Sequence, residues 1–162
     1  MIALEAKGLQ TLVVGLGNPE HGDDGVGIHI VNELRNKPLP PDVWLMEGTY
    51  DTRDIFSRMM SSQRIVIIDS ARMGLSPGSV KTFLIDGVDM PQVDDLPFEM
   101  PIAEMVKMKT FLDKLPPALI IGVEPKHTDD SSSLSGEVLQ NMPTIVKRVY
   151  DAILDFAKEV VN

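Results

Sequence analysis

The chain has 162 residues, a formal net charge of −9, 43% hydrophobic residues and no cysteine. Its length favours one domain with a sizeable core, and the lack of cysteine excludes a disulfide framework, a thiolate metal site and a cysteine nucleophile. The acidic balance argues against a nucleic-acid ligand. Because there is neither an apolar run of membrane-spanning length nor a signal-peptide pattern, we expect a cytoplasmic protein. The expected oligomeric state is a monomer.

The segment Thr11–Leu34 predicts a strand, a polar turn and a helix. The β-branched run Leu12-Val13-Val14 predicts the strand, which breaks at Gly15-Leu16-Gly17-Asn18-Pro19, and apolar residues then recur every fourth position. Two adjacent carboxylates, Asp23 and Asp24, stand in the turn. One Asp would satisfy a helix N-cap, so the pair exceeds what a cap needs. Open α/β sheets keep their sites beyond the carboxyl end of a strand, where this turn lies.

Further strands are predicted over 43–46, 64–68, 79–85 and 118–123, and helices over 51–60, 102–115 and 137–160. This alternation predicts a single α/β domain over 1–162, a three-layer sandwich with a mostly parallel twisted sheet of about five strands and helices on both faces. The 79–85 strand follows a short turn, so it is the candidate for an antiparallel strand. Residues 86–101 read as a long surface loop, and Pro143 either kinks the last helix or lies in its first turn.

A second carboxylate of interest, Asp69, closes the apolar run 64–68. If that strand is parallel to the first, Asp69 lies at the same end of the sheet as Asp24. Alone, Asp69 is explained by an Asx turn. Together, the two side chains would bring carboxylate oxygens to one crevice and could hold a divalent ion, provided that a third ligand or an ordered water completes the site.

The remaining polar motifs carry weaker signals. His21 and His127 lie in polar loops from which either could reach the crevice, whereas His29 lies within the first predicted helix and is expected to be structural or exposed. Gly15-Leu16-Gly17 is similar to the start of a dinucleotide fingerprint, but Glu20 stands where the third glycine should be, and its charge would repel a pyrophosphate. A tight turn that needs glycine accounts for the two glycines.

The motifs resemble those of the [NiFe]-hydrogenase maturation endopeptidases. The run V-V-G-L-G-N, followed by G-D-D-G-V-G and a helix, is similar to the family pattern G-x-G-N, a short spacer, then D-[DE]-G-x-G. The segment Ile67–Ala71 resembles the family's strand ending in D-A, and Ile121–Pro125 resembles its G-[IV]-x-P strand end. The order and spacing agree across nearly the whole chain.

The resemblance implies an endopeptidase that clips a short C-terminal extension from a hydrogenase large-subunit precursor after nickel insertion, with the nickel in the precursor as a recognition element. Of the three family positions thought to contact metal, two carry over to Asp24 and Asp69, which are also the candidates for the catalytic site. The third, a histidine, falls at Phe98, and no histidine occurs within 86–101. The adjacent Glu99 would replace the imidazole by a carboxylate oxygen, and His21 or His127 are the other candidates for this third ligand.

Two mechanisms and two other functions stay open at this stage. The metal could polarise the scissile carbonyl or a water. Alternatively, the two Asp residues could bind nickel already in the substrate, which the resemblance favours.

A non-catalytic nickel- or precursor-binding assembly factor would explain the missing histidine. Peptidyl-tRNA hydrolases also open with a strand and G-L-G-N-P, but Asp23-Asp24-Gly25 occupies the turn here, and His29 is followed by Ile30 rather than forming a histidine-asparagine pair.

Overall fold

The computed structural model describes residues 10–48, 52–85 and 116–158. Its five-stranded sheet has the order β2-β1-β3-β5-β4. In chain order the strands are β1 (Thr11–Leu16), β2 (Val43–Gly48), β3 (Arg64–Ser70), β4 (Val80–Ile85) and β5 (Ala118–Val123). The helical elements are the 3-10 turn η1 (Gly22–Gly25), α2 (Val26–Leu34), α3 (Thr52–Met60) and α5 (Gly136–Ala157).

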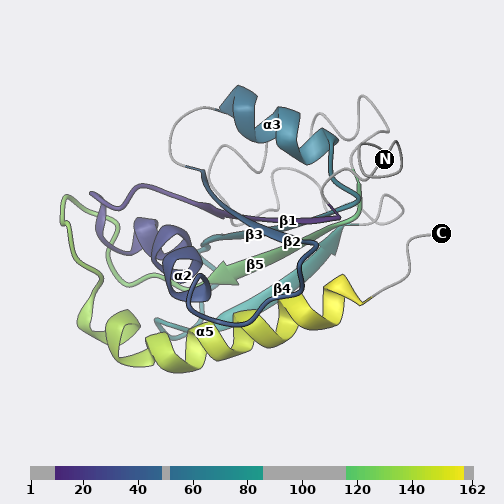
Figure 1. The fold of residues 1–162 in the computed structure, drawn as a ribbon. Helices are drawn as coiled ribbons and strands as arrows, with labels where there is room; N and C mark the ends of the chain where they lie inside the picture. The colour runs from purple at the N-terminus through teal and green to yellow at the C-terminus, as the bar shows by residue number, and fades with distance from the viewer. Residues whose placement is uncertain (1–9, 49–51, 86–115, 159–162) are drawn as a thin grey trace, which may run out of the picture.

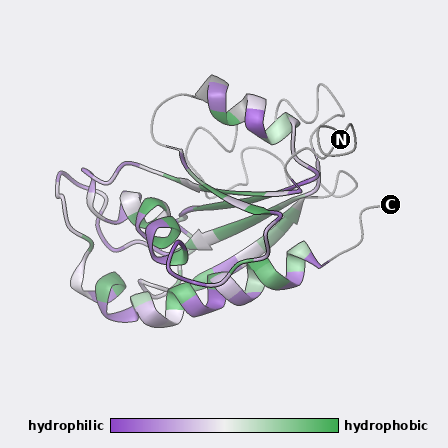
Figure 2. Cartoon of the chain, viewed as in Figure 1, coloured by the Kyte–Doolittle hydropathy of each residue, from purple (hydrophilic) through white to green (hydrophobic). Residues whose placement is uncertain are grey.

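The elements form three layers, with α3 on one face of the sheet and α2 and α5 on the other (Figure 1). Side chains alternate between the faces of a strand, and β1 does so: Leu12 and Val14 pack in the core beneath α3, whereas Val13 packs in the core with α2 and α5. Hydrophobic and hydrophilic residues alternate along α5 (Figure 2), as in an amphipathic helix. The sheet is therefore buried on both faces.

The predicted fold class is confirmed. β2, β1, β3 and β5 are parallel, and β4 pairs with β5 in the antiparallel direction. Pro143 lies inside α5, which continues through it, rather than in the first turn. The loop predicted for 86–101 and the helix predicted for 102–115 lie outside the described residues. None of the described helices is long and apolar enough to cross a membrane.

The order of the strands places a topological switch point between β1 and β3. The chain leaves β1 through α2 on one face to reach β2, then passes through α3 on the other face to reach β3, which lies on the far side of β1 (Figure 1). Crossovers that diverge to opposite faces create the switch point at which open α/β sheets bind ligands, outside the carboxyl ends of the strands. Asp24 follows β1 and Asp69 ends β3, so both belong to this point.

The first strand is longer than predicted because Gly15 lies inside β1 and not in the turn. A Cβ on Gly15 would stand 2.2 Å from the carbonyl oxygen of Gly27 in α2. A Cβ on Gly27 would stand 2.3 Å from the carbonyl oxygen of Ile68 in β3. These two glycines thus let α2 pack directly against the strand backbones. The turn itself uses Gly17, whose φ of 120° is favourable only for glycine.

The close contact of Gly27 with strand backbones predicts that one added methyl group lowers the free energy of unfolding. Gly27→Ala gains at most about 1 kcal/mol of helix propensity, but the methyl group would meet two backbone carbonyls, so we expect a net loss of about 3 kcal/mol in unfolding free energy. The measurement is urea denaturation. The matched control is Gly136→Ala at the start of α5, where a Cβ would meet nothing within 4 Å and stability should be unchanged or slightly higher. Equal effects of the two changes would contradict the packing described.

Candidate active site

Asp24 is held at this switch point by hydrogen bonds to both oxygens of its half-buried carboxylate. The backbone N–H of Asn18 donates to Oδ2 at 3.1 Å, and the hydroxyl of Ser70 donates to Oδ1 at 3.3 Å. The first contact lies within the turn after β1, whereas the second reaches the end of β3. The carboxylate therefore spans the gap between these two neighbouring strands.

Asp69 lies at the same edge, buried at the end of β3. Its Oδ1 accepts a hydrogen bond from the backbone N–H of Ser70 at 2.8 Å, which is the N–H of the next residue and not the one two residues on that defines an Asx turn. Ser70 thus contacts both carboxylates, through its backbone N–H to Asp69 and through its hydroxyl to Asp24. The expectation that residues distant in the chain meet at one edge of the sheet agrees with this geometry.

The neighbouring acid, Asp23, has a different task. Its side chain is fully buried, and three backbone N–H groups donate to it: those of Lys126 and His127 to Oδ2 and that of Ser135 to Oδ1, at 2.8, 3.1 and 2.7 Å. Its own N–H donates to the carbonyl oxygen of His127 at 2.7 Å. Asp23 therefore ties η1 to the loop between β5 and α5, whereas Asp24 bonds to the end of β3.

These contacts set the ionisation of Asp23. Burial alone would raise the pKa of the carboxyl, but the hydrogen bonds donated by Ser135, Lys126 and His127 outweigh it and hold the pKa below the usual value of 3.8. The carboxylate is consequently charged at neutral pH and bound to its amide donors.

Glu124 is a second anchor, and the sequence analysis missed it. This carboxylate is only 5% exposed and accepts the backbone N–H groups of Met73 and Leu75, each at 2.8 Å or less. It fixes the loop that leaves β3 after Asp69. The only signal in the sequence is an acid placed directly after a buried strand. An acid at that position can equally be a solvated loop residue, so the signal does not identify a buried anchor.

The histidines are spread around this edge without forming a ligand set. His21 is exposed, with its Nε2 3.8 Å from a carboxylate oxygen of Asp130. His127 has an exposed side chain and contributes its backbone, and His29 is half-buried in α2 with an unpartnered Nε2. In the part of the chain that the structure describes, no three His, Asp or Glu side chains are grouped to hold a metal. Phe98 and Glu99 lie outside that part.

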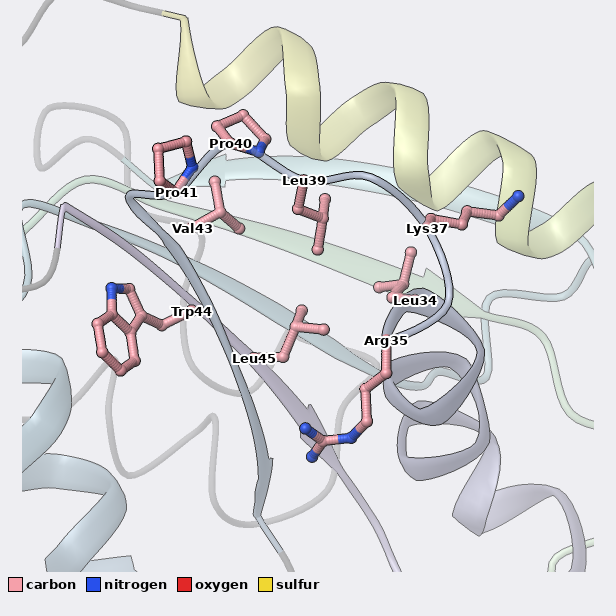
Figure 3. Close-up of a pocket in the computed structure, with 9 residues that line it drawn as sticks. All are labelled: Leu34, Arg35, Lys37, Leu39, Pro40, Pro41, Val43, Trp44 and Leu45. Atoms are coloured by element: carbon pink, nitrogen blue, oxygen red, sulfur yellow. The ribbon is translucent and has the colours of Figure 1, made fainter.

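A groove elsewhere on the molecule does not belong to this site. It has a volume of about 620 Å³ and lies between the end of α2 and the beginning of β2 (Figure 3). Since β2 is parallel to β1, the groove lies at the amino ends of the strands, opposite the edge that carries Asp24 and Asp69. Its lining is apolar with two cationic residues: Leu34, Arg35, Lys37, Leu39, Pro40, Pro41, Val43, Trp44 and Leu45.

A family model described as hydrogenase maturation protease matches residues 28–152, which is most of the chain. The chain belongs to the hydrogenase maturation protease family. It is accordingly a hydrolase of the peptidase class, and this decides against the peptidyl-tRNA hydrolase alternative. The residues that carried the resemblance, in the turn after β1 and at the ends of β3 and β5, all lie at the carboxyl edge of the sheet.

Similar proteins support the same assignment. A protein of Methanocaldococcus jannaschii whose name places it among these proteases is 26% identical over 88% of this chain and 95% of its own length. The hydrogenase expression/formation protein HupD of Thiocapsa roseopersicina is 24% identical over 91% of this chain and 69% of its own.

Solved structures with the same fold include maturation proteases from bacteria and archaea. The maturating endopeptidase HybD of Escherichia coli aligns with a TM-score of 0.74 at 19% identity, over 90% of this chain and 93% of that one. The [NiFe] hydrogenase maturation protease HybD of Thermococcus kodakarensis aligns with a TM-score of 0.65 at 25% identity, over 88% of this chain and 98% of its own.

The anchoring of Asp23 predicts a pH-dependent contribution to stability. Asp23→Asn offers one acceptor oxygen in place of two and should lower the unfolding free energy at pH 7 by about 1–3 kcal/mol. Because the folded-state pKa of Asp23 is lowered, its contribution is complete above the ordinary value of 3.8 and is lost as the pH falls below it. Urea denaturation at pH 7 and pH 3 should thus show a difference between wild type and variant that shrinks at pH 3.

The control for this measurement is Asp155→Asn, which alters an exposed carboxylate on α5. It should change stability by less than about 0.5 kcal/mol at both pH values. A difference between Asp23→Asn and wild type that stays constant from pH 7 to pH 3 would contradict the assigned ionisation.

Proposed function

We propose that this protease acts in the cytoplasm, as a monomer, on a [NiFe]-hydrogenase large-subunit precursor and removes its C-terminal extension after nickel insertion. The proposal further assigns Asp24 and Asp69 to contact with the nickel that the precursor carries. The observation that supports it best is the linkage of both carboxylates through Ser70 at the switch point of the sheet. Family membership supplies the class of substrate, and this geometry supplies the candidate contact.

The number of ligands favours a recognition role over a resident metal cofactor. At the carboxyl edge the described residues offer two carboxylates, and none of the described acids and histidines adds a third ligand to them. A divalent ion needs more ligands than two carboxylates provide. A nickel ion already held by the precursor brings its own ligands, so two oxygens from the protease would suffice to recognise it and to orient the bound chain for cleavage.

We propose Glu99 as the third contact, in place of the family's histidine. A carboxylate is a harder ligand than an imidazole, but borderline ions such as nickel accept both oxygen and nitrogen donors. Two carboxylates that already accept hydrogen bonds at the same edge would then be joined by a third from the segment after β4.

The central test mixes nickel-loaded precursor with protease variants and reads the mass of the large subunit. Asp24→Asn and Asp69→Asn keep the shape of each side chain but remove its charge, and we expect each to slow cleavage by about 100-fold. Asp151→Asn, which breaks an exposed ion pair with Lys147 on α5, is the control and should cleave at the wild-type rate. Full cleavage by the Asp69 variant would refute the assignment.

The same assay separates the protease from a non-catalytic assembly factor, the function favoured by the absence of histidine within 86–101. An assembly factor on this fold would bind the precursor and leave its mass unchanged. The protease should release the extension in proportion to the nickel-loaded fraction of the precursor.

A separate prediction concerns Glu99. We expect Glu99→Ala to weaken binding of the nickel-loaded precursor by about 10-fold and to leave binding of the nickel-free precursor unchanged, because only the former presents an ion to this carboxylate. Glu99→His should retain nickel-dependent binding, since imidazole is also a nickel ligand. The measurement is calorimetric titration with each form of the precursor. If the alanine variant binds both forms like wild type, the third contact lies elsewhere.

A further inference from the structure

Ser70 hydrogen-bonds to both candidate carboxylates. Its backbone N–H donates to Oδ1 of Asp69 at 2.8 Å, and its hydroxyl donates to Oδ1 of Asp24 at 3.3 Å. We infer that Ser70 is a positioning residue that holds the carboxylate of Asp24 in the plane needed to contact the nickel of the precursor. This inference rests on the proposed function and adds a residue to it.

The geometry explains why a hydroxyl is useful at this place. A carboxylate rotates about its last side-chain bond unless both ends are held. The N–H of Asn18 holds Oδ2 of Asp24 from the turn, and Ser70 holds Oδ1 from β3. Without the hydroxyl only one end is fixed, and the carboxylate is free to turn away from β3 and from Asp69.

A hydrogen bond to Oδ1 does not prevent the same oxygen from contacting a metal. An ionised carboxylate has about four lone-pair positions on its two oxygens, and the two hydrogen bonds to Asp24 occupy two of them. Ser70 is itself only half-buried, so the edge that it bridges is accessible to a bound chain. Groups that orient metal-binding carboxylates typically contribute about 10–100-fold to metal affinity.

The contact also determines which atom of Ser70 matters. Its backbone N–H, which serves Asp69, survives any substitution except proline, whereas its hydroxyl, which serves Asp24, is removed by alanine and kept by threonine. Replacing this one side chain therefore tests the link to Asp24 separately from the bond to Asp69.

The test compares Ser70→Ala and Ser70→Thr in the full chain. The measured quantity is the ratio of the Kd for nickel-free precursor to the Kd for nickel-loaded precursor, which isolates the part of the affinity that depends on nickel. We expect Ser70→Ala to reduce this ratio by about 10-fold or more and Ser70→Thr to restore it. A general loss of folding would weaken binding of both forms and leave the ratio unchanged.

The matched control is Ser62→Ala. Ser62 is buried, and its hydroxyl donates to the carbonyl oxygen of Arg58 at 2.8 Å, just before the amino end of β3. This variant removes the same atom at the opposite edge of the sheet, so its ratio should equal that of wild type.

The outcomes separate this inference from the proposed function. If Asp24→Ala lowers the ratio and Ser70→Ala does not, the positioning role is wrong while the nickel contact stands. If Ser70→Ala and Ser70→Thr lower the ratio equally, the hydroxyl is not the cause and the inference also fails. If Asp24→Ala leaves the ratio unchanged, the nickel contact itself is refuted, whatever Ser70 does.

Discussion

The structure depends on a direct contact between the backbone of α2 and the backbones of β1 and β3. Glycine makes it, because a Cβ at Gly15 or Gly27 would come within 2.3 Å of a carbonyl oxygen. In each case the space that a methyl group would need is filled by the polypeptide itself. The close approach brings the turn after β1 back over the end of the sheet. Asp24 thereby lies within hydrogen-bonding distance of β3.

The two adjacent acids of this turn have different surroundings, because one is buried among backbone amides and the other is half-exposed at the edge of the sheet. Asp23 accepts hydrogen bonds from three backbone amides of a loop that lies more than a hundred residues further along the chain. Its negative charge is therefore stabilised inside the protein. The carboxylate of Asp24 stays half-exposed between the turn and the end of β3. The arrangement explains why position 23 carries a short side chain: a longer acid could not fit among amide donors already at 2.7 to 3.1 Å.

Periodicity and composition were sufficient for the architecture, since the buried runs 64–68 and 118–123 and the spacing in 26–34 admit few other folds. They placed Gly15 in the turn and not inside β1. A glycine that permits close packing between two elements cannot be told, from the sequence alone, from a glycine that permits a turn. They also could not separate Asp23 from Asp24 or detect Glu124. The roles of Asp23 and Glu124 are decided by backbone amides of distant segments, and that of Asp24 by its contact with Ser70 at the end of another strand. Tertiary contacts of that kind have no local pattern.

The place of β5 governs when this protein can acquire its shape during synthesis. β5 lies between β3 and β4 although it follows both in the chain, so no native hairpin joins the two earlier strands. While the ribosome is still making residues before 118, β4 has no neighbour in the sheet, and the amides that bind Asp23 do not yet exist. The complete sheet, and with it the anchoring of Asp23, therefore forms only after most of the chain has been translated.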